Sequence, residues 1–399
     1  MARDIPHAVP PADAVVIGAG AIGMAIAWRV ASHGVAVALV DERPGRGSSW
    51  AAAGMLAPVT EAHHGEEELL ELNLASRDRW PDFAAALEDA AGRAAGYRES
   101  GTVVVARDRD DLAELDALQA LLQRHGLAVE RLTSGELRQL EPGLSPGVRG
   151  GLLAPDDHQV DNRRLVGALS AACQRAAVTT IRQHALGLDV EAGRVSGCRL
   201  ADGSTIRCDT VVLAAGARSG QLAGLPPGGV PVRPVKGQLL HLRPPPAGTA
   251  AARTPLARHN VRVVAGRPGR PAVYAVPRTD GRLVVGATVE ERGFDPAVTA
   301  GAVLNLLREA YELLPAISEL ELAETVVGFR PGTPDNAPLL GPGPLDGLVL
   351  ATGHFRNGIL LAPVTADIVT TLLTTGELVE LARPFTPQRF AGARARVAP

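Results

Sequence analysis

Residues 14–32 of the chain read AVVIGAGAIGMAIAWRVAS, and this stretch decides the fold. Its first four residues form an apolar run that predicts a short buried strand, and residues 21–32 have the pattern of a helix. A second apolar run at residues 35–40, VAVALV, predicts another buried strand. Two consecutive buried strands joined by a helix predict parallel pairing through a right-handed crossover, as in the opening unit of an α/β fold.

The turn between the first strand and the helix has the form G-x-G-x-x-G, with glycines at Gly18, Gly20 and Gly23. In a dinucleotide-binding turn, the first glycine permits the tight turn, the second lets the backbone approach a pyrophosphate, and the third allows close packing. Asp41 ends the second strand, where an acid holds ribose hydroxyls, and Glu42 is the neighbouring candidate. We therefore predict dinucleotide binding, with a purely structural glycine turn as the alternative. The motif does not distinguish FAD from NAD.

A loop of small residues follows the acid closely and reads SSWAAAGM at residues 48–55. Small side chains let backbone amides approach a large planar ligand. The alternative interpretation of this loop is a flexible connection without a ligand.

The chain has 399 residues, a net charge of −3 and 46% apolar residues. This length predicts two or three domains or one long wound domain, and the apolar content excludes disorder as the main state. The chain has no long basic stretch, which argues against a dedicated nucleic-acid binder.

Three scattered cysteines, Cys173, Cys198 and Cys208, have no Cys-x-x-Cys spacing and predict neither a disulfide framework nor a metal site. The most apolar early stretch covers residues 14–28, short of the roughly 20 residues that a membrane-spanning helix needs. The opening residues lack the cationic start of a signal peptide. We therefore expect a cytoplasmic protein with no membrane partner, no nucleic-acid partner and no bound metal.

The sequence changes character between residues 231 and 289, where several short β-rich segments follow one another. This pattern predicts an antiparallel sheet, different in kind from the opening unit. The single lysine, Lys236, lies at the start of one of these strands. We interpret it as a structural residue, and a role in oxygen chemistry is the alternative.

Two late motifs each place an arginine among glycine, proline and aromatic residues. The first, VGFRPGTPDNAP at residues 327–338, contains Arg330, and the second, GHFRNGI at residues 353–359, contains Arg356. Two guanidinium groups in one apolar pocket need an anion, and a substrate carboxylate suits the planar fork of arginine. The alternative is a surface arginine held by a backbone carbonyl.

Together with VVLAAG at residues 211–216 and the SSWAAAGM loop, these motifs resemble the FAD-dependent amine and amino-acid oxidases of the D-amino-acid oxidase group. Within this group they are most similar to the glycine oxidases of thiamine biosynthesis. The resemblance covers residues 13–377 and implies a Rossmann-like FAD-binding domain joined to an antiparallel-sheet substrate domain. Some relatives attach the flavin through a late cysteine, but no cysteine follows Cys208, so we expect FAD to be bound non-covalently.

The resemblance also implies which residues contact the cofactor and the substrate. The implied FAD contacts lie at the phosphate turn, the ribose, the small-residue loop, the adenine and the isoalloxazine ring, in that order: Gly18, Gly20, Ala21, Ile22 and Gly23; Asp41 and Glu42; Ser48, Ser49, Ala53, Gly54 and Met55; Leu186; and His354, Phe355, Arg356, Asn357, Gly358, Ile359 and Leu360. Arg330 is implied to grip the substrate carboxylate, with Arg356 and Tyr274 beside the substrate. Val289 matches a pocket position that is often larger and apolar.

The implied activity is oxidative deamination of glycine to glyoxylate, ammonia and hydrogen peroxide, with O₂ as the electron acceptor, in the thiazole branch of thiamine biosynthesis. Sarcosine and small D-amino acids are alternative substrates, and an acceptor other than O₂ would make the protein a dehydrogenase. A non-catalytic dinucleotide-binding protein is the alternative of another class. Relatives in this family commonly form homo-oligomers, which we expect here.

The expected architecture has two discontinuous domains. Residues 13–90, 150–230 and 324–380 are assigned to the FAD-binding domain. Residues 91–149 and 231–323 are assigned to the substrate-binding domain.

Overall fold

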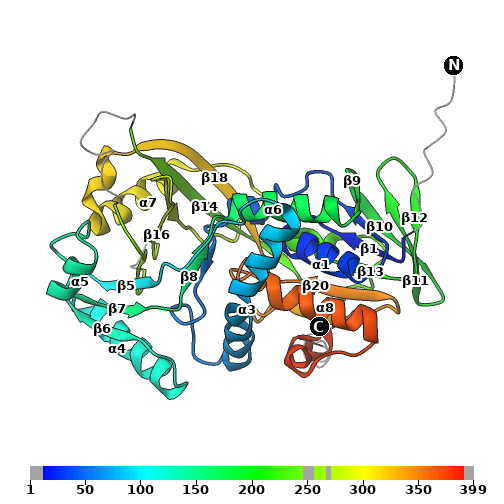
Figure 1. The fold of residues 1–399 in the computed structure, drawn as a ribbon, viewed down its shortest axis with the longest axis horizontal. Coiled ribbons are helices and arrows are strands. Elements are labelled where there is room, and N and C mark those ends of the chain that lie inside the picture. Colours follow the sequence, from blue (N-terminus) through cyan, green and yellow to red (C-terminus); the bar gives the residue numbers. More distant parts are fainter. Residues whose placement is uncertain (1–11, 246–255, 267–270, 391–399) are drawn as a thin grey trace, which may run out of the picture.

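The structure is a computed structural model that describes residues 12–245, 256–266 and 271–390. Two large sheets form two lobes side by side, with the six-stranded sheet on the right and the eight-stranded sheet on the left of Figure 1. Among the described residues, no helix is both long and apolar enough to cross a membrane. The same residues contain no group of three or more His, Cys, Asp or Glu side chains arranged to hold a metal ion.

The six-stranded sheet has the order β19-β20-β13-β1-β2-β9, and every neighbouring pair is parallel except β19 with β20. Its strands are β1 (Ala14–Ile17), β2 (Val37–Val40), β9 (Thr179–Ile181), β13 (Val211–Leu213), β19 (Leu339–Pro342) and β20 (Leu348–Thr352). The opening unit therefore has the parallel pairing that its sequence predicts. Because successive parallel strands begin at one edge and end at the other, the loops after β1, β2, β13 and β20 gather at the carboxyl edge.

Helices and a small sheet cover the two faces of the six-stranded sheet. One face packs against α1 (Ala21–Ser32), α3 (Glu67–Ala91), α6 (Asn162–Arg175) and α8 (Ala362–Thr375). The other face packs against a three-stranded sheet of β10 (Ala185–Glu191), β11 (Arg194–Leu200) and β12 (Thr205–Arg207), through residues such as Val15, Leu188 and Ile206. The inner strands β1, β2, β13 and β20 are buried on both sides, which explains their continuous apolar runs.

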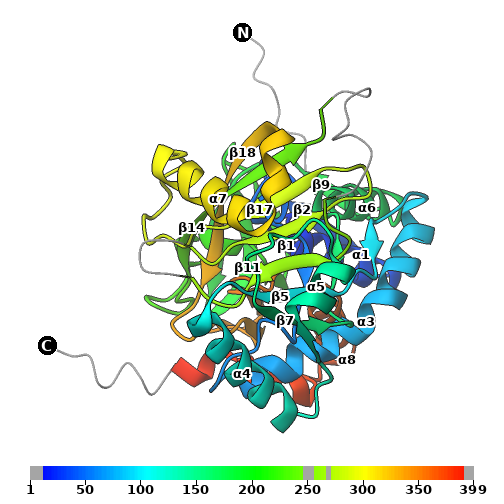
Figure 2. The ribbon, with the colours of Figure 1, turned by 90° about the vertical axis from the view of Figure 1, so that its left-hand side faces the viewer.

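The eight-stranded sheet has the order β18-β14-β17-β16-β15-β5-β7-β6. Its strands are β5 (Thr102–Ala106), β6 (Glu130–Thr133), β7 (Gly150–Ala154), β14 (Arg233–Arg243), β15 (Asn260–Val263), β16 (Tyr274–Pro277), β17 (Leu283–Gly286) and β18 (Glu321–Gly332). The sheet is mixed and not purely antiparallel as expected, because β15 pairs with β5 in parallel. Figure 2, which looks onto this lobe, shows α7 (Ala300–Leu313) above and α4 (Arg109–Arg124) below; α5 (Ser134–Leu140) packs on β6 and β7.

Short elements connect the two lobes. A second three-stranded sheet is formed by β3 (Met55–Leu56), β8 (His158–Val160) and β4 (Tyr97–Arg98). The expected loop after β2 contains a short helix, α2 (Ser48–Ala51), followed by β3. The remaining elements are 3-10 helices: η1 (Gly216–Gln221), η3 (Pro315–Glu319), η4 (Glu380–Phe385) and η5 (Pro387–Phe390).

Strands β7 and β18 lie in the eight-stranded sheet. The domain boundaries expected at residues 150 and 324 assign most of the residues of these two strands to the FAD-binding domain. Strand β7 pairs with β5 and β6, and the glycine at Gly151 allows this pairing, since a Cβ there would lie 2.6 Å from the carbonyl oxygen of Val104. Strand β18 pairs along β14 from Gly332 to Glu321. The division of the chain into two discontinuous domains stays a prediction, and these strands show where its boundaries depart from the sheets.

Candidate active site

The glycine turn lies at the carboxyl edge of β1, and its geometry leaves no room for larger residues. Gly18 has a φ of +103°, and a Cβ there would lie 2.4 Å from the carbonyl oxygen of Ala214. A Cβ on Gly23 would lie 1.8 Å from the carbonyl oxygen of Gly18. Helix α1 begins directly after Gly20, which has no side chain that could cap the helix. The first turn of α1 therefore offers N–H groups and partial positive charge to an anion, as a pyrophosphate site requires.

Asp41 and the loop after it hold this turn in shape. One carboxylate oxygen of Asp41 accepts a hydrogen bond from the N–H of Ala19 at 2.8 Å, and the other accepts from the N–H of Arg43 at 2.8 Å. The Ser49 hydroxyl accepts from the N–H of Ala21 at 2.9 Å, and the Ser48 hydroxyl donates to the carbonyl of Phe329. The small-residue loop therefore contacts both the phosphate turn and β18 of the other sheet, so it is not a free connection.

Glu42 and Leu186, the residues predicted to contact the ribose and the adenine, belong to two segments that meet at His184. The carboxylate of Glu42 is 3.9 Å from Nδ1 of His184, and Leu186 follows two residues later on β10. The side chain of Leu186 is apolar yet 49% exposed, while its carbonyl accepts from the N–H of Ala223 at 3.2 Å. The exposed apolar side chain of Leu186 would offer an adenine ring the apolar surface that such a ring needs.

The small-residue loop is anchored from behind by an arginine that sequence reasoning missed. Arg278 is buried, and its guanidinium donates to the carbonyl of Ala53 at 2.7 Å, to Oδ1 of Asn162 at 3.2 Å and to Oε1 of Gln159 at 2.9 Å. Burial lowers its pKa to about 10. Arg278 therefore fixes the backbone next to Gly54, and its position in the VPR triplet after Tyr274 was the available signal.

The segment between β20 and α8 is fixed in an unusual backbone conformation. Gly353 has a φ of +76°, and a Cβ there would lie 2.6 Å from Cγ2 of Thr333. Phe355 has a φ of +45°, and its N–H donates to the carbonyl of Pro331 at 3.0 Å. This hydrogen bond holds the predicted flavin segment against β18, one residue after Arg330.

The residues of this segment divide into two groups. Ile359 and Leu360 are buried in the core beside α1 and α3, so their side chains do not line an open site. The carbonyl of Leu360 accepts from Oγ of Ser76 at 2.6 Å and from Nε1 of Trp80 at 2.9 Å. The N-terminal part of the segment, with Phe355 and Arg356, lies against β18 and the loop after β3.

His354 makes the stability of this segment dependent on pH. The imidazole is buried, Nε2 lies 3.0 Å from Oγ1 of Thr365, and burial lowers its pKa from 6.5 to about 3. The folded state therefore binds fewer protons than the unfolded chain between these pH values, so stability decreases as the pH falls through this window.

We expect the difference in free energy of unfolding between wild type and the His354→Gln variant to shrink by about 2 kcal/mol between about pH 7.5 and pH 5. Urea denaturation at the two pH values measures it. His33→Gln, at an exposed position, serves as the control and should leave the pH dependence of the wild type unchanged. Equal pH dependence of wild type and His354→Gln would contradict the prediction.

The side chains of Arg330 and Tyr274 each lie over a glycine of the neighbouring strand in the eight-stranded sheet. On β18, the guanidinium of Arg330 extends over Gly237 of β14, where a Cβ would lie 2.5 Å from Nη1, and Nη1 donates to the carbonyl of Thr288 at 3.0 Å. On β16, the ring of Tyr274 covers Gly286 of β17, where a Cβ would lie 2.3 Å from the hydroxyl oxygen. The two glycines therefore make room for the two side chains that were predicted to bind substrate.

The electrostatics of this pair suit a carboxylate ligand. Burial raises the pKa of Tyr274 to about 12, although the positive charge of Arg330 opposes this shift, so the hydroxyl remains a hydrogen-bond donor at neutral pH. Among the described residues, no carboxylate lies within ion-pair distance of Arg330. A partly buried guanidinium of this kind presents a planar fork of N–H donors that matches the geometry of a carboxylate.

Arg356 has a different environment from the one predicted. Its guanidinium is paired with two acids: Nε lies 3.4 Å from Oε2 of Glu61, and Nη2 lies 3.3 Å from Oε2 of Glu66. Glu61 and Arg262, which pairs with it, are functional candidates that sequence reasoning missed.

Val289 is 67% exposed, so its side chain does not close a pocket in this structure. Lys236 is fully buried and donates to Asp295 at 2.9 Å and to the carbonyl of Ala297 at 2.6 Å, which agrees with its structural interpretation.

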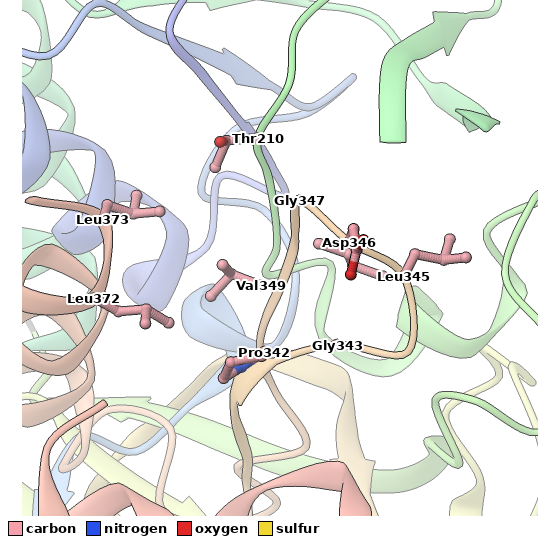
Figure 3. A pocket seen from close by; sticks show the side chains of 10 residues that line it. Thr210, Pro342, Gly343, Leu345, Asp346, Gly347, Val349, Leu372 and Leu373 are labelled. Carbon is pink, nitrogen blue, oxygen red and sulfur yellow. The ribbon is translucent and has the colours of Figure 1, made fainter. Parts of the chain in front are cut away.

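A hollow of about 260 Å³ lies away from all of these residues. Thr210 and Gly347 line it at the amino ends of β13 and β20, with Leu372 and Leu373 of α8 on one side and the loop of Leu345 on the other (Figure 3). Ligands of open α/β sheets bind beyond the carboxyl ends of the strands, so the hollow is at the wrong edge for the dinucleotide.

The parallel sheet with its glycine turn defines a dinucleotide-binding protein whose second sheet carries an arginine and a tyrosine beside the loops of the first. A family model described as FAD dependent oxidoreductase matches residues 13–372, and the chain belongs to this family. The N-terminus of α1, the closely packed glycine turn and the exposed Leu186 fit the adenine dinucleotide part of FAD.

Several proteins are similar to the chain over nearly its whole length. The glycine oxidase of Pseudomonas putida is 34% identical over 95% of this chain and 99% of that protein. The bifunctional protein ThiO/ThiG of Synechocystis sp. is 38% identical over 95% of this chain, which spans about half, 54%, of that longer protein. The crystal structure of glycine oxidase from Geobacillus kaustophilus has a TM-score of 0.86 and 32% identity, covering 96% of this chain and 99% of that one.

Proposed function

We propose that the protein catalyses the FAD-dependent oxidative deamination of glycine, in which glycine, water and O₂ give glyoxylate, ammonia and hydrogen peroxide. The observation that carries the proposal is the guanidinium of Arg330, which has no carboxylate partner among the described residues and lies beside the Tyr274 hydroxyl. The same strand, β18, contacts both predicted cofactor loops, through Ser48 and Phe355. The similarity to glycine oxidases over nearly the whole chain supports it.

In this proposal, bound FAD would supply the two-electron redox chemistry that couples oxidation of the substrate to reduction of O₂. The fork of Arg330 binds the substrate carboxylate, and the protonated hydroxyl of Tyr274 donates to the same group. These two contacts would hold the α-carbon of the substrate, which loses hydrogen in the reaction, in a fixed position. That position is defined relative to the segment that contains Phe355. The first turn of α1 would hold the pyrophosphate and Asp41 the ribose, because the helix N-terminus and the acid both lie at the carboxyl edge of the sheet.

The proposal includes the predicted context of the reaction. Glycine oxidation would supply an imine or oxo acid to the thiazole branch of thiamine biosynthesis, as the resemblance implies. Sarcosine and small D-amino acids carry the same carboxylate and amine and would use the same two contacts. The expected homo-oligomer is part of the proposal and is checked by sedimentation of the purified holoenzyme.

We expect the purified flavoprotein to release hydrogen peroxide with glycine. The amounts released with sarcosine, D-alanine and D-proline should not exceed the amount released with glycine. A peroxidase-coupled assay across these four substrates measures it, with L-alanine as a control for stereochemistry. Absence of peroxide with both glycine and sarcosine would overturn the proposed oxidase. If glycine bleaches the flavin absorbance without peroxide and an acceptor dye restores turnover, the enzyme is instead a dehydrogenase.

A further inference from the structure

A chain of ion pairs links two arginines through one glutamate at the border of the candidate active site. Oε1 of Glu61 lies 3.4 Å from Nη1 of Arg262, and its Oε2 lies 3.4 Å from Nε of Arg356. Glu66 pairs with Arg356 alone, at 3.3 Å. The Glu61 carboxylate therefore lies between both guanidinium groups, whereas Arg330 keeps no carboxylate partner among the described residues.

This bridge lies beside the residues that would bind substrate. Arg262 of β15 is directly opposite Tyr274 of β16 in the sheet register, and the charges of Glu61 and Arg262 both act on the Tyr274 hydroxyl. Arg356 belongs to the segment after β20 that is held against β18 next to Arg330. Two cationic groups thus border the site in addition to Arg330, and Glu61 balances them.

The position of Glu61 is set by its backbone as well as by its side chain. The buried carboxylate of Asp157 accepts from the N–H of Val59 at 3.0 Å and from the N–H of Thr60 at 2.7 Å. Arg262 also donates to the carbonyl of Thr60 at 2.8 Å, and Arg356 donates to the carbonyl of Glu61 at 3.2 Å. A pair anchored at this many points is a fixed part of the site, unlike an exposed surface ion pair.

We propose that Glu61 is a specificity-determining residue that restricts the enzyme to amines with a single carboxylate. Arg262 and Arg356 would otherwise form a second carboxylate-binding site, and Glu61 already fills it with its own carboxylate. A substrate with a second carboxylate meets the negative charge of Glu61 and finds both guanidinium groups taken, which is a repulsive contribution to specificity. This inference rests on the proposed function, since it assumes that Arg330 binds the first carboxylate.

Two matched substrate pairs test the inference, because the members of each pair differ by one carboxylate group. They are iminodiacetate with sarcosine, and D-aspartate with D-alanine. We expect the wild type to use the dicarboxylate member of each pair far less well. In the Glu61→Gln variant, which keeps the size of the side chain and removes its negative charge, the ratio of kcat/KM for dicarboxylate over monocarboxylate should rise at least about tenfold in one pair or both.

The Glu66→Gln variant is the matched control, because it removes an acid from Arg356 and leaves the Glu61 bridge in place. Its ratios should stay within about threefold of the wild type. Ratios that are unchanged in Glu61→Gln, or a wild type that uses iminodiacetate as well as sarcosine, would overturn the inference, and the wild-type measurement does not depend on the folding of any variant. Failure of the proposed function looks different, since then neither glycine nor any of the four substrates is oxidised.

Discussion

Replacing Arg330 by alanine is expected to lower kcat/KM for glycine by about a hundredfold or more, while the protein still retains FAD. The guanidinium lies over Gly237, donates to the carbonyl of Thr288 and lies beside the Tyr274 hydroxyl. Removing one partner of a desolvated charge pair costs about 2–5 kcal/mol, which corresponds to a factor of roughly 30 to several thousand. The loss should appear mainly as a higher KM, because the contact binds substrate and is not part of the cofactor chemistry.

Steady-state peroxide release and anaerobic bleaching of the flavin by glycine measure this effect separately from reoxidation. Arg330→Lys should recover part of the activity, because a lysine restores the charge but not the planar fork. Arg243→Ala is a control on the neighbouring strand, since Arg243 is exposed and pairs with Glu321 at 2.6 Å. If kcat/KM of Arg330→Ala equals that of the wild type, Arg330 does not bind the substrate carboxylate.

Replacing Gly23 by alanine is expected to abolish stable FAD binding. A Cβ at this position would lie 1.8 Å from the carbonyl oxygen of Gly18, so the turn and α1 must move apart. Such a displacement moves the N–H groups of the first helical turn away from the place where a pyrophosphate would bind, and it disrupts the packing of α1 on the sheet.

The ratio of flavin absorbance to protein absorbance after gel filtration measures retained FAD. Gly301→Ala is the matched control, because Gly301 lies in α7 with open space around a Cβ and should accept alanine without loss of flavin. Full FAD occupancy in Gly23→Ala would contradict the assignment of this turn to the pyrophosphate.

Local sequence patterns predicted the elements whose ends carry strong signals. The bounds of α1 agree with the expectation, because glycines precede the helix. In α8, Pro363 lies in the first turn, where proline is tolerated, whereas α3 continues through Pro81 without a break. The glycine turn was predicted because its chemistry is local.

Pairing between distant segments could not be predicted in the same way. The positions of β7 and β18 in the eight-stranded sheet depend on partners far along the chain, which no local periodicity reveals. The same reason explains why Glu61 and Arg262 were missed: they are brought together by strand register and by Asp157, and neither lies in a recognisable motif. The acids that pair with Arg356 were missed for this reason as well.

The hydrogen bonds that flank Arg330 on β18 have a thermodynamic consequence. Phe329 accepts from Ser48 in one predicted cofactor loop, and Pro331 accepts from Phe355 in the other, so the residue between them is fastened on both sides. If the loops order around FAD and Arg330 binds the substrate carboxylate, as proposed, each ligand would restrain the elements that hold the other. Linkage would make this coupling reciprocal, so cofactor and substrate would each tighten the binding of the other by the same factor.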